Sequence, residues 1–140
     1  MTDIGLTHVA LLCRDAARSA RFYAAYANMQ VVHRREVEDG REVLWLSDGT
    51  RPFVIVLIEA AEVDTVLGPI AHLGVGCESR AAVDALAERA RAEGVLARAP
   101  EDSGPPVGYW AMLRDPDGHV LEISFGQEIG LTVEEKSVPK

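Results

Sequence analysis

The sequence predicts an α+β fold made of two tandem βαβββ modules. The segment from His8 to Phe22 aligns without a gap with the segment from His72 to Leu86, which lies 64 residues further along the chain. Each copy begins with the alternation of a strand and then changes to the apolar spacing of a helix. Three further apolar runs, separated by turn residues, follow each helix. These observations predict the same order of elements twice.

The first module is expected to contain a strand, a helix and three strands. Its helix begins after Asp15, a preferred N-cap residue. Asp39 and Gly40 indicate a two-residue hairpin, because both central positions of a type I′ turn need a positive φ. The expected elements are a strand at 6–13, a helix at 16–28, strands at 30–37, 41–46 and 53–59, and a connector at 60–70.

The second module repeats this order. Its helix begins after Ser79 and ends at Gly94, a residue suited to the left-handed position after a helix. We expect Asp115 to Gly118 to form the turn between the last two strands. The expected elements are strands at 70–77, 95–99, 108–114 and 119–125 and a helix at 80–93. Residues 1–126 would form one domain, with module one at about 5–59 and module two at about 71–126, and 127–140 a C-terminal tail.

Composition and charge narrow the possible partners. The chain has 140 residues, 48% of them hydrophobic, and a formal net charge of −8. A negatively charged chain whose arginines are scattered among acids is a poor ligand for phosphate backbones, so we expect no nucleic-acid partner. No C-x-x-C spacing and no apolar leader segment is present, which favours the cytoplasm and no membrane association.

Three strings resemble those of the vicinal oxygen chelate superfamily. They are Thr7-His8-Val-Ala-Leu, Ala71-His72-Leu-Gly-Val and Asp115-Pro-Asp-Gly-His-Val-Leu-Glu122-Ile. The superfamily includes glyoxalase I, methylmalonyl-CoA epimerase, extradiol dioxygenases, fosfomycin-resistance transferases and bleomycin-resistance binding proteins. The resemblance implies two curved mixed sheets that enclose a metal cleft. It also implies a homodimer, because several relatives complete this cleft across a dimer interface.

The resemblance assigns the metal ligands to His8, His72 and Glu122. Strand alternation supports the assignment, because the small residues Ala10 and Gly74 share a face with the two histidines and leave room for a ligand. Glu122 lies in an apolar strand, where a carboxylate is costly unless a cation or hydrogen-bond donors meet it. Each residue alone is more often structural or solvated, but their joint occurrence favours one divalent metal. Two imidazoles and a carboxylate suit Fe(II), with Mn, Ni, Co or Zn as alternatives.

A fourth ligand, as glyoxalase I has, is missing from the first module. Its position falls on Val56 by the family pattern or on Ile55 by an ungapped repeat, and both are apolar. Glu59 is the only carboxylate nearby. Extradiol enzymes use an additional histidine beside the metal ligands. This residue is also missing, because His33 and His119 are expected at the surface.

Tyr109 is a candidate catalytic residue whose role depends on the length of the turn before β-strand 119–125. If residues 115 and 118 pair across a two-residue turn, Tyr109 is a diagonal neighbour of Glu122 on the same face. A register one residue different would present Trp110 there instead. The two cysteines, Cys13 and Cys77, are expected to be small core residues.

The resulting hypothesis is a metalloenzyme of the glyoxalase or dioxygenase type. Its metal would chelate neighbouring oxygens of a small substrate and act as a Lewis acid or activate oxygen, with Glu122 or Tyr109 near the reacting atoms. One alternative is a metal-independent drug-binding protein of the bleomycin-resistance type. Another is a catalytically inactive relative that keeps a structural metal.

Overall fold

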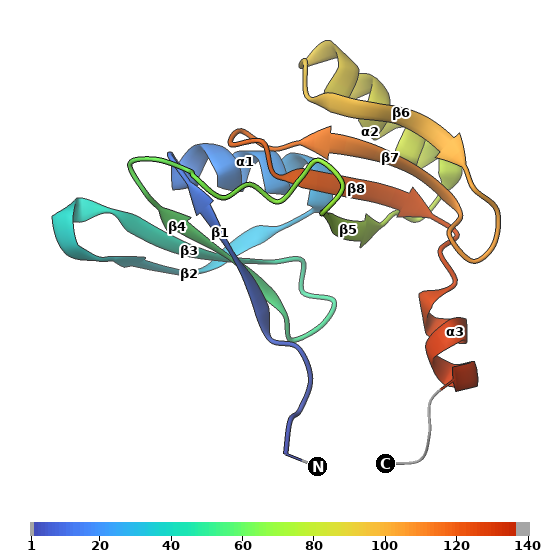
Figure 1. Cartoon of the computed structure of the whole chain (residues 1–140), viewed down its shortest axis with the longest axis horizontal. Helices are drawn as coiled ribbons and strands as arrows, with labels where there is room; N and C mark the ends of the chain where they lie inside the picture. The colour runs from blue at the N-terminus through green and yellow to red at the C-terminus, as the bar shows by residue number, and fades with distance from the viewer. Residues whose placement is uncertain (1, 137–140) are drawn as a thin grey trace. The chain divides into compact units, whose positions relative to one another are not determined.

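The protein contains two four-stranded mixed sheets, each with one helix along it, which confirms the α+β prediction of two βαβββ modules. The computed structural model describes residues 2–136 (Figure 1). The first module contains β1 (His8–Cys13), α1 (Ala16–Ala27), β2 (Gln30–Glu36), the short 3-10 helix η1 (Glu38–Gly40), β3 (Glu42–Ser47) and β4 (Val54–Glu59). The second contains β5 (Leu73–Gly76), α2 (Arg80–Ala92), β6 (Leu96–Asp102), β7 (Tyr109–Arg114) and β8 (Val120–Phe125).

The two sheets have the same topology. Their strand orders are β1-β4-β3-β2 and β5-β8-β7-β6. In each sheet the first and last strands of the module pair in parallel, with His8 opposite Val54 in one and Gly74 opposite Glu122 in the other. The sequence repeat is therefore a repeat of topology. Both sheets are curved and neither closes on itself.

The chain divides into two compact units whose boundary differs from that of the sequence repeat. We call residues 4–72 with 114–120 the N-terminal unit, and residues 73–113 with those from 121 onward the C-terminal unit. The turn between β7 and β8 thus belongs to the unit built by the first module. This turn carries the string that begins at Asp115, so part of the second repeat completes the first.

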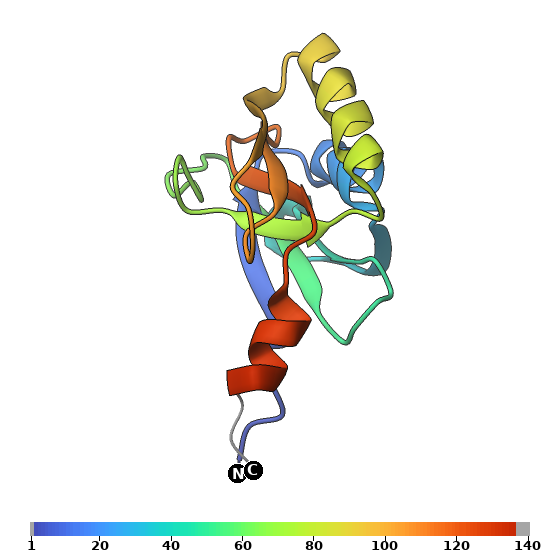
Figure 2. The same ribbon diagram turned by 90° about the vertical axis from the view of Figure 1, so that its right-hand side faces the viewer.

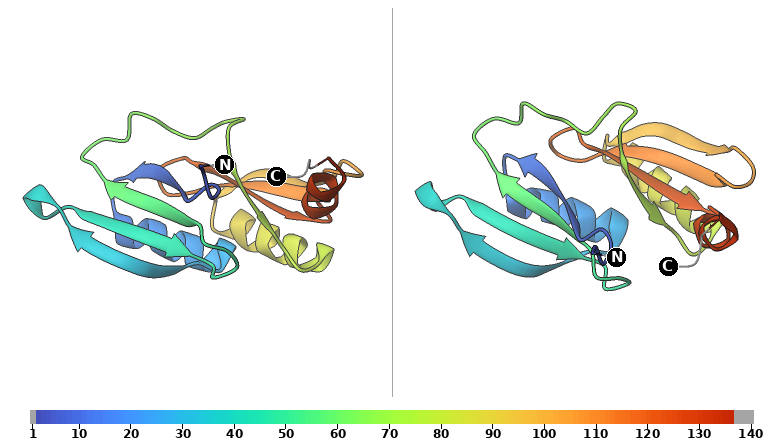
Figure 3. Two further views of the ribbon diagram at one scale, coloured as in Figure 1. Left: turned by 90° about the horizontal axis from the view of Figure 1, so that it is seen from below. Right: turned by 60° about the horizontal axis from the view of Figure 1, so that its bottom comes forward.

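The core of the N-terminal unit lies between α1 and its sheet (Figure 3). The side chain of Asp15 caps α1 by accepting a hydrogen bond from the Arg18 amide at 3.0 Å, and the helix ends at Asn28, which has a φ of 53°. Phe22 contacts the rings of Tyr23 and Tyr26 at centroid distances of 5.1 and 5.0 Å. The sheet contributes fully buried residues, among them Leu44, Leu46, Ile55 and Leu57.

The C-terminal unit is built in the same way, with α2 along one face of its sheet (Figure 2). The Ser79 side chain caps α2 by accepting from the Ala82 amide at 3.0 Å. Gly94 has a φ of 75° just beyond the helix, as its position in the sequence predicts. The core contains small and aliphatic residues that are at most 1% exposed: Val83, Ala87, Ala90, Ala111, Leu113, Leu121 and Ile123.

Both hairpin turns have three residues between the paired positions. Asp39 and Gly40 do adopt positive φ values of 67° and 73°, but the Val37 amide donates to the Arg41 carbonyl at 2.8 Å across a three-residue connection. Likewise the Asp115 amide donates to the His119 carbonyl at 2.8 Å. The two-residue turn predicted at Asp39 is therefore wrong, and the two-residue connection on which the role of Tyr109 depends is not formed. A shift of one residue reverses which face each side chain takes.

The expected tail contains a further helix, α3 (Ile129–Lys136), and residues 137–140 lie outside the described part of the chain. The Glu128 amide donates to the Pro106 carbonyl at 2.9 Å, which connects the segment before α3 to the loop before β7. No helix among residues 2–136 is both long and apolar enough to cross a membrane.

Candidate metal centre

His8 is the first residue of β1 and is exposed. Its Nδ1 lies 2.9 Å from the hydroxyl oxygen of Thr7. Ala10 is also exposed on this strand, whereas Leu11 and Cys13 are buried. The predicted alternation is confirmed, and the neighbouring side chain on the His8 side is a single methyl group.

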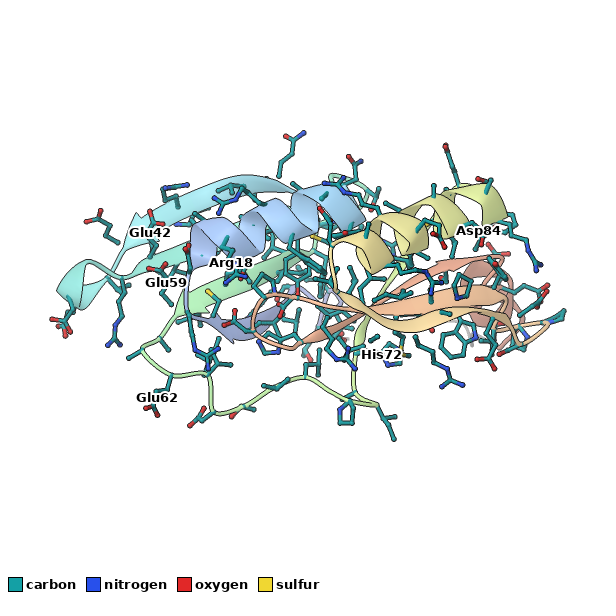
Figure 4. The ribbon with its side chains drawn as sticks, turned by 90° about the horizontal axis from the view of Figure 1, so that it is seen from above. Arg18, Glu42, Glu59, Glu62, His72 and Asp84 are labelled. Carbon is teal, nitrogen blue, oxygen red and sulfur yellow. The ribbon has the colours of Figure 1, made fainter. Side chains whose placement is uncertain are left out.

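His72 immediately precedes β5, at the end of the connector, and is exposed (Figure 4). Its Nδ1 lies 2.6 Å from the backbone oxygen of Ile70. A carbonyl oxygen only accepts, so Nδ1 carries the proton and Nε2 keeps its lone pair. A backbone carbonyl on Nδ1 is a common way to orient a histidine that binds metal through Nε2.

Glu122 lies in β8 and is 7% exposed. Within the C-terminal unit it is opposite Gly74, and a Cβ placed on that glycine would lie 3.4 Å from Oε2. Among residues 2–136, its side-chain hydrogen bond comes from one neutral donor, the Gln127 amide, at 3.1 Å from Oε2. A carboxylate can accept from several donors, so Glu122 has the capacity for a further partner.

The structure describes these three residues in different units. His8 and His72 belong to the N-terminal unit and Glu122 to the C-terminal unit. Within the described chain, no group of three His, Cys, Asp or Glu side chains is arranged to hold a metal ion. The trio as one site therefore stays a prediction, while the environment of each member is defined.

The register identifies the first-module position equivalent to Glu122. Ala10 pairs with Val56 in β1 and β4, as Gly74 pairs with Glu122 in β5 and β8. Val56, rather than Ile55, is thus the equivalent residue, and it is apolar. The absence of a fourth carboxylate from this position follows from the strand pairing.

Glu59 has a structural role instead. Its Oε2 accepts from the Ala16 amide at 2.9 Å, and its Oε1 accepts from the Glu42 amide at 2.7 Å. The labelled side chains of Glu42 and Glu59 lie at the same end of this sheet (Figure 4). A carboxylate at the first residue of α1 is also favourable for the helix dipole. Both of its oxygens are engaged.

The register required for the role of Tyr109 is wrong. With Asp115 paired to His119, the strand pairing places Met112 opposite Glu122, and Tyr109 takes the α2 side of the sheet. Its hydroxyl donates to Asp84 of α2, and the Arg80 guanidinium lies 3.8 Å from its ring centroid. The hydrogen bond to Asp84 raises the pKa of Tyr109.

Trp110, the residue expected there if the register differs by one, lies on the same face of the sheet as Glu122. It is 8% exposed, and its Nε1 donates to the Ser103 hydroxyl at 2.8 Å. The Arg98 guanidinium lies 4.7 Å from its ring centroid. Trp110 is therefore a packed residue with its polar atom satisfied.

His119 is buried, contrary to the surface position expected for it. It is 1% exposed, its Nε2 donates to the Leu12 carbonyl at 2.8 Å, and its Nδ1 accepts from the Leu67 amide at 2.9 Å. The imidazole thus connects β1 to the connector.

A buried polar cluster surrounds the turn after β7. We call Ser19, Tyr23, Asp115, Asp117 and His119 the turn cluster. The Tyr23 hydroxyl donates to Asp115 Oδ2 at 2.8 Å, and Asp115 Oδ1 accepts from the Asp117 and His119 amides, each at 2.9 Å. Asp117 accepts from the Ser19 hydroxyl at 3.3 Å. These bonds attach the turn to α1 inside the N-terminal unit.

Cys13 is buried in the core as expected, whereas Cys77 is only half-buried and is not a core residue. Burial raises the pKa of Cys13 to about 12, and the carboxylates of Asp117 and Glu59 add to the shift. Burial also raises the pKa of Cys77. Because thiolates react and thiols do not, we expect no labelling of Cys13 by iodoacetamide at pH 8 within minutes, slower labelling of Cys77 than of a free thiol, and two labels per chain in urea. Mass spectrometry locates and counts the labels, and rapid labelling of Cys13 in the folded protein would contradict its burial.

The comparisons with known proteins agree with this architecture. The chain is 37% identical over 137 residues to the uncharacterized protein PA2024 of Pseudomonas aeruginosa, covering 96% of this chain and 97% of that one. The fosfomycin resistance protein FosX of Listeria monocytogenes, solved as a point mutant with Mn(II) and 1S,2S-dihydroxypropylphosphonic acid, is 18% identical with a TM-score of 0.70, covering 94% and 99% of the two chains.

Glyoxalases share the fold as well. The trypanothione-dependent glyoxalase I of Leishmania major is 24% identical with a TM-score of 0.68, covering 95% of this chain and 94% of that one. A glyoxalase I mutant of Zea mays has a TM-score of 0.67 at 24% identity, and the match covers 85% of this chain but 43% of the maize chain. The family model of the Glyoxalase/Bleomycin resistance protein/Dioxygenase superfamily matches residues 5–123. Together with the repeated βαβββ topology, this match shows that the chain belongs to that superfamily, the vicinal oxygen chelate superfamily.

Proposed function

We propose that the protein is a metal-dependent enzyme of the glyoxalase or dioxygenase type. His8, His72 and Glu122 would hold one divalent metal, with two neighbouring oxygens of a small substrate as its further ligands. The observation that carries the proposal is Glu122, a 7% exposed carboxylate that has one neutral side-chain donor and a glycine beside it. Such a carboxylate is favourable when a cation completes its surroundings.

The protein residues of the proposed site have distinct tasks. The carbonyl of Ile70 fixes the His72 tautomer, so that Nε2 keeps its lone pair for a metal. The Gln127 amide holds Oε2 of Glu122, and this leaves Oε1 to face the metal or to accept a proton from carbon next to a substrate carbonyl. The metal, when bound, would act as a Lewis acid on substrate oxygens, and Fe(II) suits two imidazoles and a carboxylate, with Mn, Ni, Co or Zn as alternatives.

Two kinds of reaction fit this donor set. The apolar Val56 at the fourth position favours the oxygen-dependent kind, which uses a three-ligand triad. His33 contacts Trp45 and His119 is buried in the turn cluster, so neither serves as the extra histidine of extradiol enzymes, which favours isomerase or lyase chemistry. Oxygen consumption by Fe(II)-loaded protein given a catechol distinguishes the two. Homodimer assembly, expected from the resemblance, remains part of the proposal.

The metal site itself has a direct test. We expect the protein to bind close to one equivalent of a divalent metal, and His72→Ala to weaken that binding by at least 100-fold, about 2.7 kcal/mol. His33→Ala is the matched control, because His33 is an exposed histidine outside the trio. Elemental analysis and titration with a metal indicator measure both quantities. No binding of Fe, Mn, Ni, Co or Zn, or an equal loss in the control, would refute the site.

A metal-independent small-molecule binding protein is the second candidate. The exposed aromatic surface around Trp45, which is 38% exposed, favours it. In that case an apolar compound would bind equally well to the wild type and to His8→Ala.

A further inference from the structure

The face of the first sheet opposite α1 carries an unusual set of side chains. We call it the His8 face. Strand alternation and the register assign to it, with Gln30 and Ser47 at one end, His8, Ala10, Leu12, His33, Arg35, Val43, Trp45, Val54, Val56 and Ile58. Leu44, Leu46, Ile55 and Leu57 take the opposite, buried side toward α1. The proposed ligand His8 thus shares a surface with an exposed tryptophan, a second histidine and an arginine.

The His8 face has no carboxylate, although the chain carries a net charge of −8. The acidic residues of this sheet lie on the α1 side, at one end of the strands. Glu59 accepts from the amides of Ala16 and Glu42, and the carboxylate of Glu42 also pairs with Arg34. The sheet therefore separates charge, with its carboxylates on one side and Arg35 on the other. A positively charged, acid-free surface on an acidic protein is complementary to an anion.

Trp45 is a large aromatic residue in the interior of this sheet. It is 38% exposed, pairs with Val56 on one neighbouring strand and with His33 on the other, and has the His33 ring 4.8 Å from its own. Its β-strand is not at an edge. An exposed indole beside an imidazole offers a flat surface on which a planar group can stack.

Arg35 lies two residues beyond His33 on β2 and is exposed. Among the described residues it has no ion pair. Its neighbour Arg34, on the opposite face of the same strand, pairs with Glu42 at 2.8 Å. Arg35 therefore presents a guanidinium that is free to bind a carboxylate, for which its planar donors are suited.

We propose that the His8 face binds the planar, anionic part of the substrate, which is an aromatic or conjugated carboxylate. Trp45 stacks on its plane and Arg35 binds its carboxylate. Neighbouring strands are about 4.8 Å apart, so Trp45 lies about 10 Å from β1, a span that one substituted aromatic molecule covers. The assignment of this molecule as substrate rests on the proposed function, whereas its binding by Trp45 and Arg35 does not.

The test uses cinnamate, which is planar and anionic but has no neighbouring oxygens for a metal, and the full-length protein freed of metal by a chelator. Calorimetry should show binding, and Arg35→Gln should raise the Kd for cinnamate about fivefold to tenfold while leaving the neutral methyl ester unchanged. Arg34→Gln is the matched control and should change neither ligand. Trp45→Leu should weaken both ligands, and Trp45→Phe should restore most of the affinity.

Each contrary result has a distinct meaning. Equal effects of Arg35→Gln and Arg34→Gln, or no cinnamate binding, would overturn the proposal. If Arg35→Gln and Trp45→Leu dissociate a dimer in sedimentation and leave cinnamate affinity unchanged, a second copy of the chain covers the face and the proposal is also overturned. The two neighbouring oxygens of 3,4-dihydroxycinnamate test the metal part of the site. If metal does not tighten the binding of this compound, the proposed function is contradicted but the binding of the carboxylate by Trp45 and Arg35 is not.

Discussion

Replacing Asp115 with alanine should lower the free energy of unfolding by about 4 kcal/mol. The carboxylate is 5% exposed and accepts hydrogen bonds from the Tyr23 hydroxyl and from the amides of Asp117 and His119. Alanine would leave three donors without their acceptor. The Tyr23 hydroxyl is fully buried, so water cannot replace the carboxylate there without a local opening. Urea unfolding followed by circular dichroism measures the loss.

Two further variants make this expectation specific. Tyr23→Phe removes one donor and keeps the other two bonds, and should cost about 1–2 kcal/mol. Asp64→Ala, at an exposed aspartate of the connector, should stay within about 0.5 kcal/mol of the wild type. A loss in Asp115→Ala no larger than in Asp64→Ala would show that the turn cluster contributes little to stability.

The turn cluster also implies a dependence on pH. Burial raises the pKa of Tyr23, and the carboxylate of Asp115 adds to this effect. The folded protein therefore keeps the phenol proton above pH 10, where an unfolded chain releases it. The stability linked to Tyr23 is complete below about pH 10 and is lost as the pH rises further, and Tyr23→Phe should lack this part of the alkaline loss.

Introducing a carboxylate at Val56 should make the stability of the protein depend on bound metal. Val56 is 9% exposed and occupies the position that Glu122 has in the second module. Val56→Glu should destabilise the metal-free protein by about 3 kcal/mol, because the new carboxylate has no donor. If the trio binds metal as proposed, the new side chain becomes a fourth ligand, and saturating metal should recover most of the loss. Thermal unfolding with and without Mn(II) or Ni(II) measures the recovery.

Ile55→Glu is the matched control for this experiment. Ile55 is 2% exposed and points toward α1, so its carboxylate cannot reach a metal held at His8. It should destabilise the protein at least as strongly, with no recovery on adding metal. Recovery in both variants would indicate nonspecific binding, and recovery in neither would contradict a metal bound next to this strand.

The order of the elements was predictable from the sequence because it depends on local patterns. Alternation, N-cap residues and the glycine after α2 located the strands and helices, and the 64-residue repeat showed that the topology occurs twice. The lengths of the two turns were not predictable in this way. The Asp115 turn gains a residue because its carboxylate accepts amides within the turn and a hydroxyl from α1, and this second contact is invisible in the local sequence.

The length of the turn after β7 matters most near Glu122. A register one residue different exchanges Tyr109 and Trp110 between the two faces of the sheet, so the phenol expected near Glu122 binds Asp84 instead. The partner of Glu122 was missed for a similar reason, because Gln127 lies in the segment expected to be a tail. Contacts between segments distant in sequence decide these details.

The close approach of Gly108 to the chain after β8 is one such contact. Gly108 has a φ of 86°, and a Cβ there would lie 2.5 Å from the Phe125 carbonyl oxygen. The glycine lets the loop before β7 approach the backbone that continues to Gln127. The position of the Gln127 amide, and through it that of Glu122, therefore depends on a residue with no polar side chain.

The place of the turn after β7 in the N-terminal unit has a consequence for synthesis of the chain. The first sheet and α1 are complete in sequence by Glu59, yet the Tyr23 hydroxyl has no acceptor until Asp115 has been made. Chains are synthesised and fold from the N-terminus, so the N-terminal unit would gain its last buried contacts only after Asp115 has been synthesised. A nascent chain or fragment that stops in the connector should therefore fold incompletely, although it contains a whole copy of the repeat.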